Sequence, residues 1–325
     1  MSSASISVKI VPDKKPQVSV EMEQKIEQAA ELICNCDAIL FTSGAGMSAS
    51  SGLGTFRGSA ATTWPPLLQH PKLDYMQIVD PEWFHKTQGN STERDTANFA
   101  YAFWTDLYNE YASTNPHRGY SIAKEWSELD HVKSAFSFTS NIDGHWIRSG
   151  WNDSSVFECH GSIHYMQCVN NCCDHVWATN DNLKLEIDRK TNCAISTLPV
   201  CSACHALARP NIVMFNDFHF AGQKYNENIN FYNQFKTDVA TAQAKLLIIE
   251  LGAGTTVPTV RHESECLFTD KRWTAHLIRI NPLDEHSTIN KSIQEKSNGK
   301  ALEITLDSLV ALTLMDKAVK SKRKQ

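Results

Sequence analysis

The chain has 325 residues and a formal net charge of −5, and 42% of its residues are hydrophobic. This length and apolar content suit one large domain, or a large and a small one, with a real core. The net negative charge gives no electrostatic basis for nucleic-acid binding, and no stretch approaches the roughly 18 apolar residues of a membrane span. We therefore expect direct contact with neither nucleic acid nor a membrane.

The two ends of the chain carry little pattern. Residues 1–20 lack hydrophobic periodicity, so we expect a flexible N-terminal arm. Residues 317–325 hold a basic cluster that we interpret as a solvated tail. The N-terminus lacks the apolar run of a signal peptide, which favours a cytoplasmic protein. A nuclear address in the basic tail is the alternative.

Helix and strand patterns alternate along residues 21–316, which we predict to be the catalytic domain. Apolar residues recur at helical spacing over 21–35, and a closing helix is expected from Leu306 to about Val319. Short apolar runs predict buried strands at 38–42, 135–139, 156–158, 211–215, 245–251, 275–280 and 302–305. This alternation predicts an α/β fold with a Rossmann-like, doubly wound parallel sheet. Residues 70–115 are rich in aromatics with few strand signals, which predicts a helical insert.

A glycine-rich turn follows the first predicted strand. Residues 44–58 read Gly-Ala-Gly-Met-Ser-Ala-Ser-Ser-Gly-Leu-Gly-Thr-Phe-Arg-Gly. Glycines at a strand-to-helix turn let backbone N–H groups approach a pyrophosphate, and the helix N-terminus adds a favourable dipole. No acidic residue follows at the end of a clear second strand about 20 residues later, which argues against a classical dehydrogenase.

Cysteines cluster between residues 166 and 208 and predict a small zinc-ribbon module. Cys201 and Cys204 form one half of the ribbon, and Cys168 with Cys173 supplies the other, with Cys172 as the alternative to Cys173. Such a four-thiolate site is closed, so it stabilises a module and leaves no open position for chemistry. Cys193 is a further substitute ligand. The sequence Cys-Ser-Ala-Cys-His also matches haem attachment, but that pattern leaves the upstream cysteines unexplained.

Five motifs, in order along the chain, resemble segments of the sirtuin family. Residues 44–58 resemble the fingerprint Gly-Ala-Gly-x-Ser-x-x-Ser-Gly-Ile-Pro-Asp-Phe-Arg-Gly, and residues 139–145 resemble Thr-Gln-Asn-Ile-Asp-Gly-Leu-His. Residues 158–162 resemble the segment with the catalytic His-Gly-Ser, and residues 209–217 resemble Arg-Pro-Asp-Val-Val-x-Phe-Gly-Glu. Residues 252–258 stand where the family has a Gly-Thr-Ser turn before Val and Pro.

The resemblance implies a division of roles among these residues. Asp143, with the backbone near Ile142, would hold the nicotinamide carboxamide, Asn141 would orient a water or ribose hydroxyl, and His160 would be the general base. Phe56 and Arg57 would cover the reacting ribose. The full set implied to bind NAD is Gly44, Ala45, Gly46, Phe56, Arg57, Ser140, Asn141, Ile142, Asp143, Gly252, Ala253, Gly254 and Asn281. The substrate peptide would pair with Val213, Phe215 and Asn216.

The function implied is an NAD-dependent protein lysine deacylase (deacetylase) that acts on acylated lysine and releases nicotinamide and O-acyl-ADP-ribose. The chain departs from the family pattern at several positions, which marks it as a divergent member. Asn216, for example, replaces a glycine, although Asn tolerates positive φ. The alternatives are an NAD-consuming ADP-ribosyltransferase or NAD glycohydrolase on the same fold, and a non-catalytic sensor of NAD or ADP-ribose.

Overall fold

The computed structural model describes residues 18–55, 64–69, 73–86 and 96–324. Its centre is a six-stranded sheet in the order β11-β10-β9-β1-β2-β3, in which every neighbouring pair is parallel. The strands are β1 Ala38–Ser43, β2 Ser134–Thr139, β3 Val156–Glu158, β9 Lys245–Leu251, β10 Thr274–Ile280 and β11 Ala301–Ile304. All six residues of β1 are buried, as expected for a strand covered on both faces. The predicted doubly wound sheet is confirmed.

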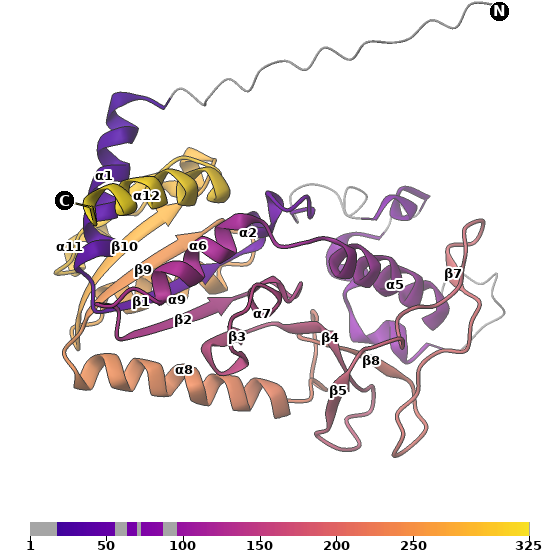
Figure 1. Ribbon diagram of the computed structural model, residues 1–325. Coiled ribbons are helices and arrows are strands. Elements are labelled where there is room, and N and C mark those ends of the chain that lie inside the picture. The colour runs from indigo at the N-terminus through magenta and orange to yellow at the C-terminus, as the bar shows by residue number, and fades with distance from the viewer. Residues whose placement is uncertain (1–17, 56–63, 70–72, 87–95, 325) are drawn as a thin grey trace, which may run out of the picture.

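Helices cover both faces of this sheet (Figure 1). One face is covered by α1 Val20–Asn35, α6 Arg118–Ser127 and α12 Ser308–Lys322, and the other by α8 Gln223–Thr241 and α9 Thr259–Thr269. Short elements connect the layers: α2 Ala45–Ala49, α7 His145–Arg148, η3 Asp153–Ser155, α10 Asp284–Ser287 and α11 Lys291–Lys296. None of the helices in the described ranges is long and apolar enough to cross a membrane.

A smaller lobe packs around its own apolar cluster. It holds the antiparallel sheet β5-β4-β8 and a two-stranded hairpin. Its strands are β4 Gly161–Cys168, β5 Val176–Ala178, β6 Ile187–Asp188, β7 Cys193–Ala194 and β8 Ala208–Ile212. Its helical part consists of η1 Pro65–Gln69, α4 Tyr75–Ile78, η2 Pro81–Phe84 and α5 Ala97–Ser113. Helix is thus the main regular structure in the described part of the 70–115 insert.

Two predictions about the chain are wrong. The apolar run at 211–215 is not a strand of the parallel sheet, because β8 ends at Ile212 and pairs antiparallel with β4. Apolar content predicted its burial but could not specify its partner. Residues 317–322 belong to a helix rather than to a solvated tail, because α12 continues to Lys322 with Ala318 and Val319 buried.

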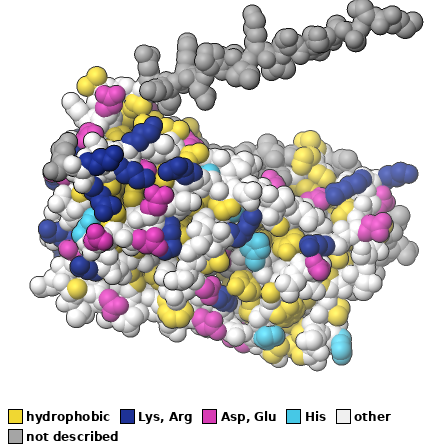
Figure 2. All heavy atoms as spheres, in the orientation of Figure 1, with side chains coloured by type: hydrophobic (Ala, Val, Ile, Leu, Met, Phe, Trp, Pro, Cys, Tyr) yellow, Lys and Arg dark blue, Asp and Glu magenta, His cyan; other side chains and the backbone are white. Residues whose placement is uncertain are grey.

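The charges at the end of α12 are balanced by neighbouring acids. Lys320 bonds to Asp316 and Glu125, and Lys322 pairs with Glu27 of α1. Figure 2 shows Lys and Arg side chains gathered over the α1–α12 end of the molecule, with Asp and Glu side chains among them. The cluster therefore ties helices together.

The carboxyl ends of the strands are joined by backbone hydrogen bonds that continue beyond the sheet. Gly44 N–H donates to the carbonyl of Leu251, and Gly46 N–H donates to that of Gly252, both at 3.0 Å. Gly252 has φ +60°, and a Cβ there would lie 2.3 Å from the Gly46 carbonyl carbon. The turns after β1 and β9 therefore pack backbone to backbone.

Gly252→Ala should lower the free energy of unfolding by about 2–5 kcal/mol, since it combines a left-handed backbone with a steric clash. Gly54→Ala is the matched control, because a Cβ at Gly54 meets no atom of the described part of the chain within 4 Å. Urea unfolding of the two variants measures the difference. Equal unfolding midpoints would contradict the close packing of the two turns.

Candidate active site and metal centre

A buried hydrogen-bond network links the glycine-rich turn to the loop after β2. Ser48 Oγ, in α2, donates to Asp143 Oδ2 at 2.5 Å and accepts from Asn141 Nδ2 at 3.0 Å. Asp143 Oδ1 accepts the backbone N–H of His145 at 2.9 Å. Asn141 and Asp143 are both under 10% exposed. The two polar residues predicted from one motif are thus brought together and fixed in orientation.

His160 follows β3 at the same carboxyl edge of the sheet. Its Nε2 lies 3.4 Å from Thr259 Oγ1 at the start of α9, and its carbonyl accepts the Val213 N–H at 2.9 Å. Burial lowers the pKa of His160 below its ordinary value of 6.5, and a hydrogen bond with the Ser140 backbone partly offsets this shift. The imidazole is therefore neutral at pH 7 and able to accept a proton.

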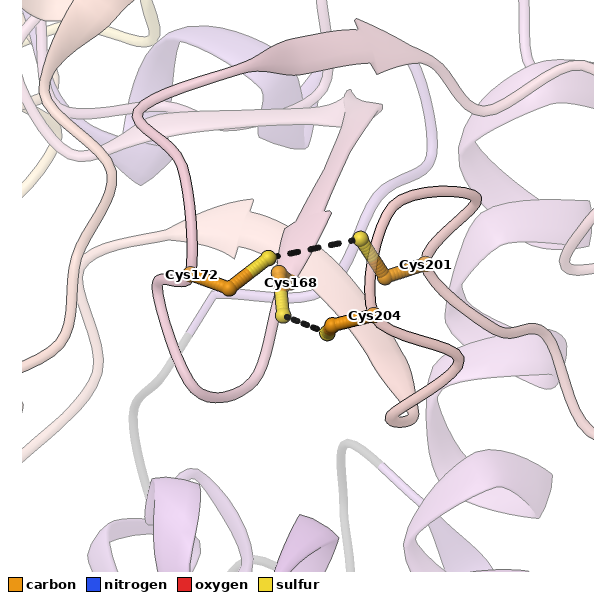
Figure 3. Close-up of side chains that lie close together, drawn as sticks. All are labelled: Cys168, Cys172, Cys201 and Cys204. Carbon is orange, nitrogen blue, oxygen red and sulfur yellow. Dashed lines mark hydrogen bonds between the residues drawn. The ribbon is translucent and has the colours of Figure 1, made fainter.

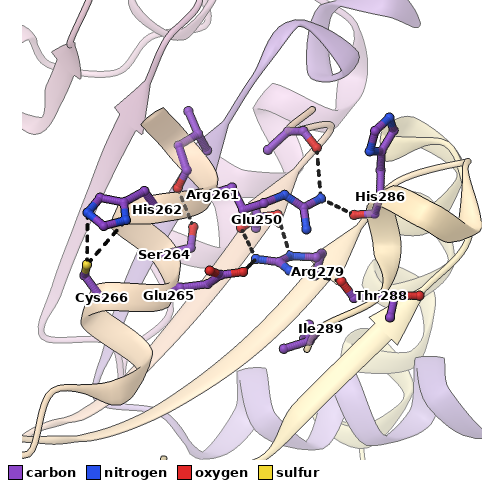
Figure 4. A network of polar contacts seen from close by, with 12 residues as sticks. Glu250, Arg261, His262, Ser264, Glu265, Cys266, Arg279, His286, Thr288 and Ile289 are labelled. Atoms are coloured by element: carbon purple, nitrogen blue, oxygen red, sulfur yellow. Dashed lines mark hydrogen bonds and ion pairs between the residues drawn. The ribbon is translucent and has the colours of Figure 1, made fainter. Parts of the chain in front are cut away.

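A buried network of charged side chains from β9, β10 and α9 lies next to the turn after β9 (Figure 4). Arg279 of β10 bonds to both oxygens of Glu250, its partner on β9, at 2.7 and 3.0 Å, and to Glu265 of α9 at 2.9 Å. Arg261 donates to the carbonyl oxygens of Ala253, in the turn after β9, and of His286, in the short helix α10 that follows β10. These contacts hold the turn and α10 together at the edge of the sheet.

The other residues predicted to bind a dinucleotide line the same edge. Asn281 Nδ2 donates to the Ala253 carbonyl at 3.1 Å, and Ser140 N–H donates to Ser43 at 3.1 Å. Gly44, Ala45 and Gly46 form the turn into α2. The structure therefore places these predicted residues along one continuous rim. Phe56 and Arg57 lie outside the described residues.

The segment after β8, predicted to bind a peptide, is fixed by a buried ion pair. Arg209 Nη2 contacts both oxygens of Asp217 at 2.8 Å, and both side chains are almost fully buried. Asn216 has φ 57°, so it adopts the left-handed backbone expected from the glycine it replaces. Val213, Met214 and Phe215 already use their N–H groups inside the chain. A neighbouring peptide strand would therefore meet the carbonyl groups of this segment.

Sequence reasoning missed two residues of the network. Ser48 lies inside the glycine-rich motif, and its spacing from the glycines is the signal in the sequence that could identify it. Tyr120 lies in α6, and its hydroxyl is 2.8 Å from Ser48 Oγ. Nothing in the sequence around Tyr120 distinguishes it from an ordinary core aromatic.

Four cysteines form a candidate metal centre in the smaller lobe (Figure 3). The Sγ atoms of Cys168, Cys172, Cys201 and Cys204 all lie within 4.8 Å of one another. Four thiols arranged in this way fit the tetrahedral, closed coordination of structural zinc. The fourth ligand is therefore Cys172 rather than the predicted Cys173, because the Cys172 sulfur belongs to this group and the Cys173 sulfur does not. Cys193 lies instead in β7, in the apolar core of the lobe.

Cys172→Ser should lose bound zinc and lower the melting temperature of the lobe, whereas Cys173→Ser should retain the metal. Metal content by mass spectrometry, measured beside thermal unfolding, checks both. The two variants carry the same Cys→Ser substitution at adjacent positions, so each is the control for the other. Zinc retained in Cys172→Ser and lost in Cys173→Ser would overturn the ligand assignment.

A half-buried acid lies beside the site, two residues before His160. Glu158 lines a small cavity with Asn211 of β8 and with Lys224 and Asn228 of α8, and two tyrosines are also part of its wall. Burial raises the pKa of Glu158 from 4.5 to about 8, and the negative charge of Asp143 adds to the rise. Glu158 is therefore protonated in the folded protein at neutral pH, while it is ionised in the unfolded chain.

This difference makes stability fall as pH rises from about 5 to 8, since the unfolded chain releases a proton that the folded protein keeps. Glu158→Gln should remove this pH dependence. As the pH rises from about 5 to 8, the free energy of unfolding of the variant should therefore increase relative to that of the unsubstituted protein, by on the order of 2 kcal/mol. Urea unfolding at pH 5.5 and 8.5 measures the change. Glu285→Gln, at an exposed position, controls for the lost charge. Identical pH dependence in the variant and the unsubstituted protein would contradict a protonated Glu158.

Comparisons with known proteins agree with this architecture. Residues 44–249 match the model of the Sir2 family. An NAD-dependent protein deacylase of Candida albicans is 24% identical over 232 residues, which cover 60% of this chain and 71% of that protein. A probable bifunctional ADP-ribose hydrolase/ADP-ribosyltransferase of Fusarium oxysporum f. sp. cubense is 28% identical over 260 residues, which cover 78% of this chain but only 41% of that protein.

The fold is also shared with solved structures. The crystal structure of a Sir2 homolog–NAD complex superimposes with a TM-score of 0.57 at 17% identity, covering 92% of this chain and 94% of that one. The matched family stretch spans more than half of the chain and contains the glycine-rich turn, Asp143, His160 and the four clustered cysteines. The chain therefore belongs to the Sir2 family.

Proposed function

We propose that this protein is an NAD-dependent protein lysine deacylase. The observation that carries the proposal is the arrangement of Asp143, Asn141 and His160. The first two share the Ser48 network, and His160 follows the neighbouring strand at the carboxyl edge of the parallel sheet. Ligands of doubly wound sheets bind at this edge. The deacylase names of relatives support the reaction class.

The residues at this edge fit NAD. The turns after β1 and β9 meet so closely that a Cβ on Gly46 would lie 2.7 Å from Gly252. Because no side chain projects from these glycines, a pyrophosphate could approach the backbone of the turns. Ala253, Gly254 and Asn281 would hold the adenosine end. When bound, NAD supplies an activated ribose carbon whose leaving group is nicotinamide. Asp143 accepts N–H donors, so it would orient the carboxamide of that group.

His160 would act as the general base on a ribose hydroxyl. The neutral imidazole, held between Ser140 and Thr259, accepts the proton, and its depressed pKa keeps it unprotonated at pH 7. Asn141 would orient a hydroxyl or a water beside it. Phe56 and Arg57 are proposed to exclude water from the ribose.

An acylated lysine in an extended peptide would lie over the segment after β8. Val213 is 40% exposed and its N–H bonds to His160, so a peptide on Val213, Phe215 and Asn216 would present its lysine next to the base. The candidate zinc centre would hold the lobe that carries this segment. β4 connects the two, since it begins at Gly161 beside His160 and ends at the ligand Cys168.

A second function is favoured by one comparison. The relative from Fusarium oxysporum is named for ADP-ribose hydrolase and ADP-ribosyltransferase activity, and Asn141, Asp143 and His160 would serve those reactions equally well. The two functions differ in whether nicotinamide release requires an acyl group.

Purified protein should convert NAD and an acetyl-lysine peptide to nicotinamide, deacetylated peptide and acetylated ADP-ribose, with no nicotinamide released when the peptide lacks the acetyl group. His160→Ala should lower the rate about 10²- to 10⁴-fold, because the general base is lost. Mass spectrometry of all products, with His262→Ala as the surface control, checks this. Free ADP-ribose or ADP-ribosylated protein formed without an acyl group would favour the transferase or hydrolase function instead.

A further inference from the structure

A chain of hydroxyl groups runs from helix α6 to the carboxylate of Asp143. The phenol of Tyr120 lies 2.8 Å from Ser48 Oγ, which lies 2.5 Å from Asp143 Oδ2. Asn141 Nδ2 also donates to Ser48 Oγ at 3.0 Å. All four residues are buried, so each of these polar groups depends on the others for its hydrogen bonds.

The number of protons fixes the direction of this chain. A serine hydroxyl has one proton and two lone pairs. Ser48 gives its proton to Asp143, and one lone pair accepts from Asn141. The remaining contact, with Tyr120, must therefore be one in which the phenol donates. Hydrogen bonds that point the same way along a chain strengthen one another in a low-dielectric interior.

The surroundings of Tyr120 suit a fixed donor. Its ring packs at 5.1 Å from Trp146, 4.9 Å from His117 and 5.5 Å from His145, measured between ring centroids. Burial raises the pKa of Tyr120 well above its ordinary value, and the charge of Asp143 adds to the rise. The phenol therefore keeps its proton under physiological conditions. The adjacent rings hold the hydroxyl in one position.

We propose that Tyr120 is a positioning residue for the nicotinamide end of the site, acting through Ser48 on Asp143. The inference rests on the proposed use of NAD. Among the described residues, each oxygen of Asp143 has one donor, His145 N–H on Oδ1 and Ser48 on Oδ2. A carboxylate oxygen accepts more than one hydrogen bond, so the same group keeps lone pairs for a carboxamide. By donating to Ser48, Tyr120 directs the Ser48 hydroxyl proton toward Asp143. The orientation of the carboxylate, and with it the direction of its remaining lone pairs, is thereby fixed.

Binding of NAD and of ADP-ribose, compared by titration calorimetry, tests this inference, because ADP-ribose lacks the nicotinamide. Tyr120→Phe keeps the ring and removes the donor. It should weaken NAD binding about three- to tenfold, as expected for one hydrogen bond, and leave ADP-ribose binding unchanged. Tyr101→Phe is the matched control, since Tyr101 is equally buried and its hydroxyl bonds to the Ala208 carbonyl, away from Ser48.

A double-mutant cycle tests the route through Ser48. In a Ser48→Ala background, Tyr120→Phe should have no further effect on NAD affinity. Equal losses of NAD and ADP-ribose affinity, unchanged NAD affinity, or additive effects in the cycle would each overturn the positioning role. If the unsubstituted protein binds ADP-ribose and NAD but fails to deacylate, only the proposed reaction falls. If it does not bind NAD at all, both proposals fall.

Discussion

The hydrogen bonds that extend the parallel ladder past the ends of the strands determine where everything at the site lies. Ser140 bonds back to Ser43, Gly44 to Leu251, Gly252 to Ile280, and Asn281 to Ile304. Each loop is thus anchored to the strand beside it before it turns away. As a result, side chains that are far apart in sequence meet on one rim.

Both helical layers contribute to this rim. The layer with α1, α6 and α12 supplies Tyr120, whose hydroxyl reaches Ser48, while the opposite layer supplies Thr259 at the start of α9, next to His160. Arg261, in the first turn of α9, connects the turn after β9 with α10. The site is therefore held from two sides of the sheet, and packing in either layer influences its geometry.

The sequence predicts the strands of the main sheet well because each is a continuous apolar run bounded by glycine or polar residues. It predicts Asn141, Asp143 and His160 through motifs at strand ends. It fails where the outcome depends on three-dimensional partners. The run at 211–215 has the composition of a central strand, but β8 pairs with β4. The choice between Cys172 and Cys173 depends on which way two neighbouring side chains turn, and Tyr120 belongs to the site only because α6 packs there.

The strand order has a consequence for how this protein is made. β1 lies between β2 and β9, and Thr42 of β1 shares a hydrogen bond with Ser264, 222 residues later in the chain. At ribosomal speeds of about 5–20 residues per second, β1 waits roughly 10–40 seconds for its second neighbour. During that time an apolar strand presents at least one open edge. The nascent chain is therefore exposed to wrong strand pairing at β1 until β9 emerges.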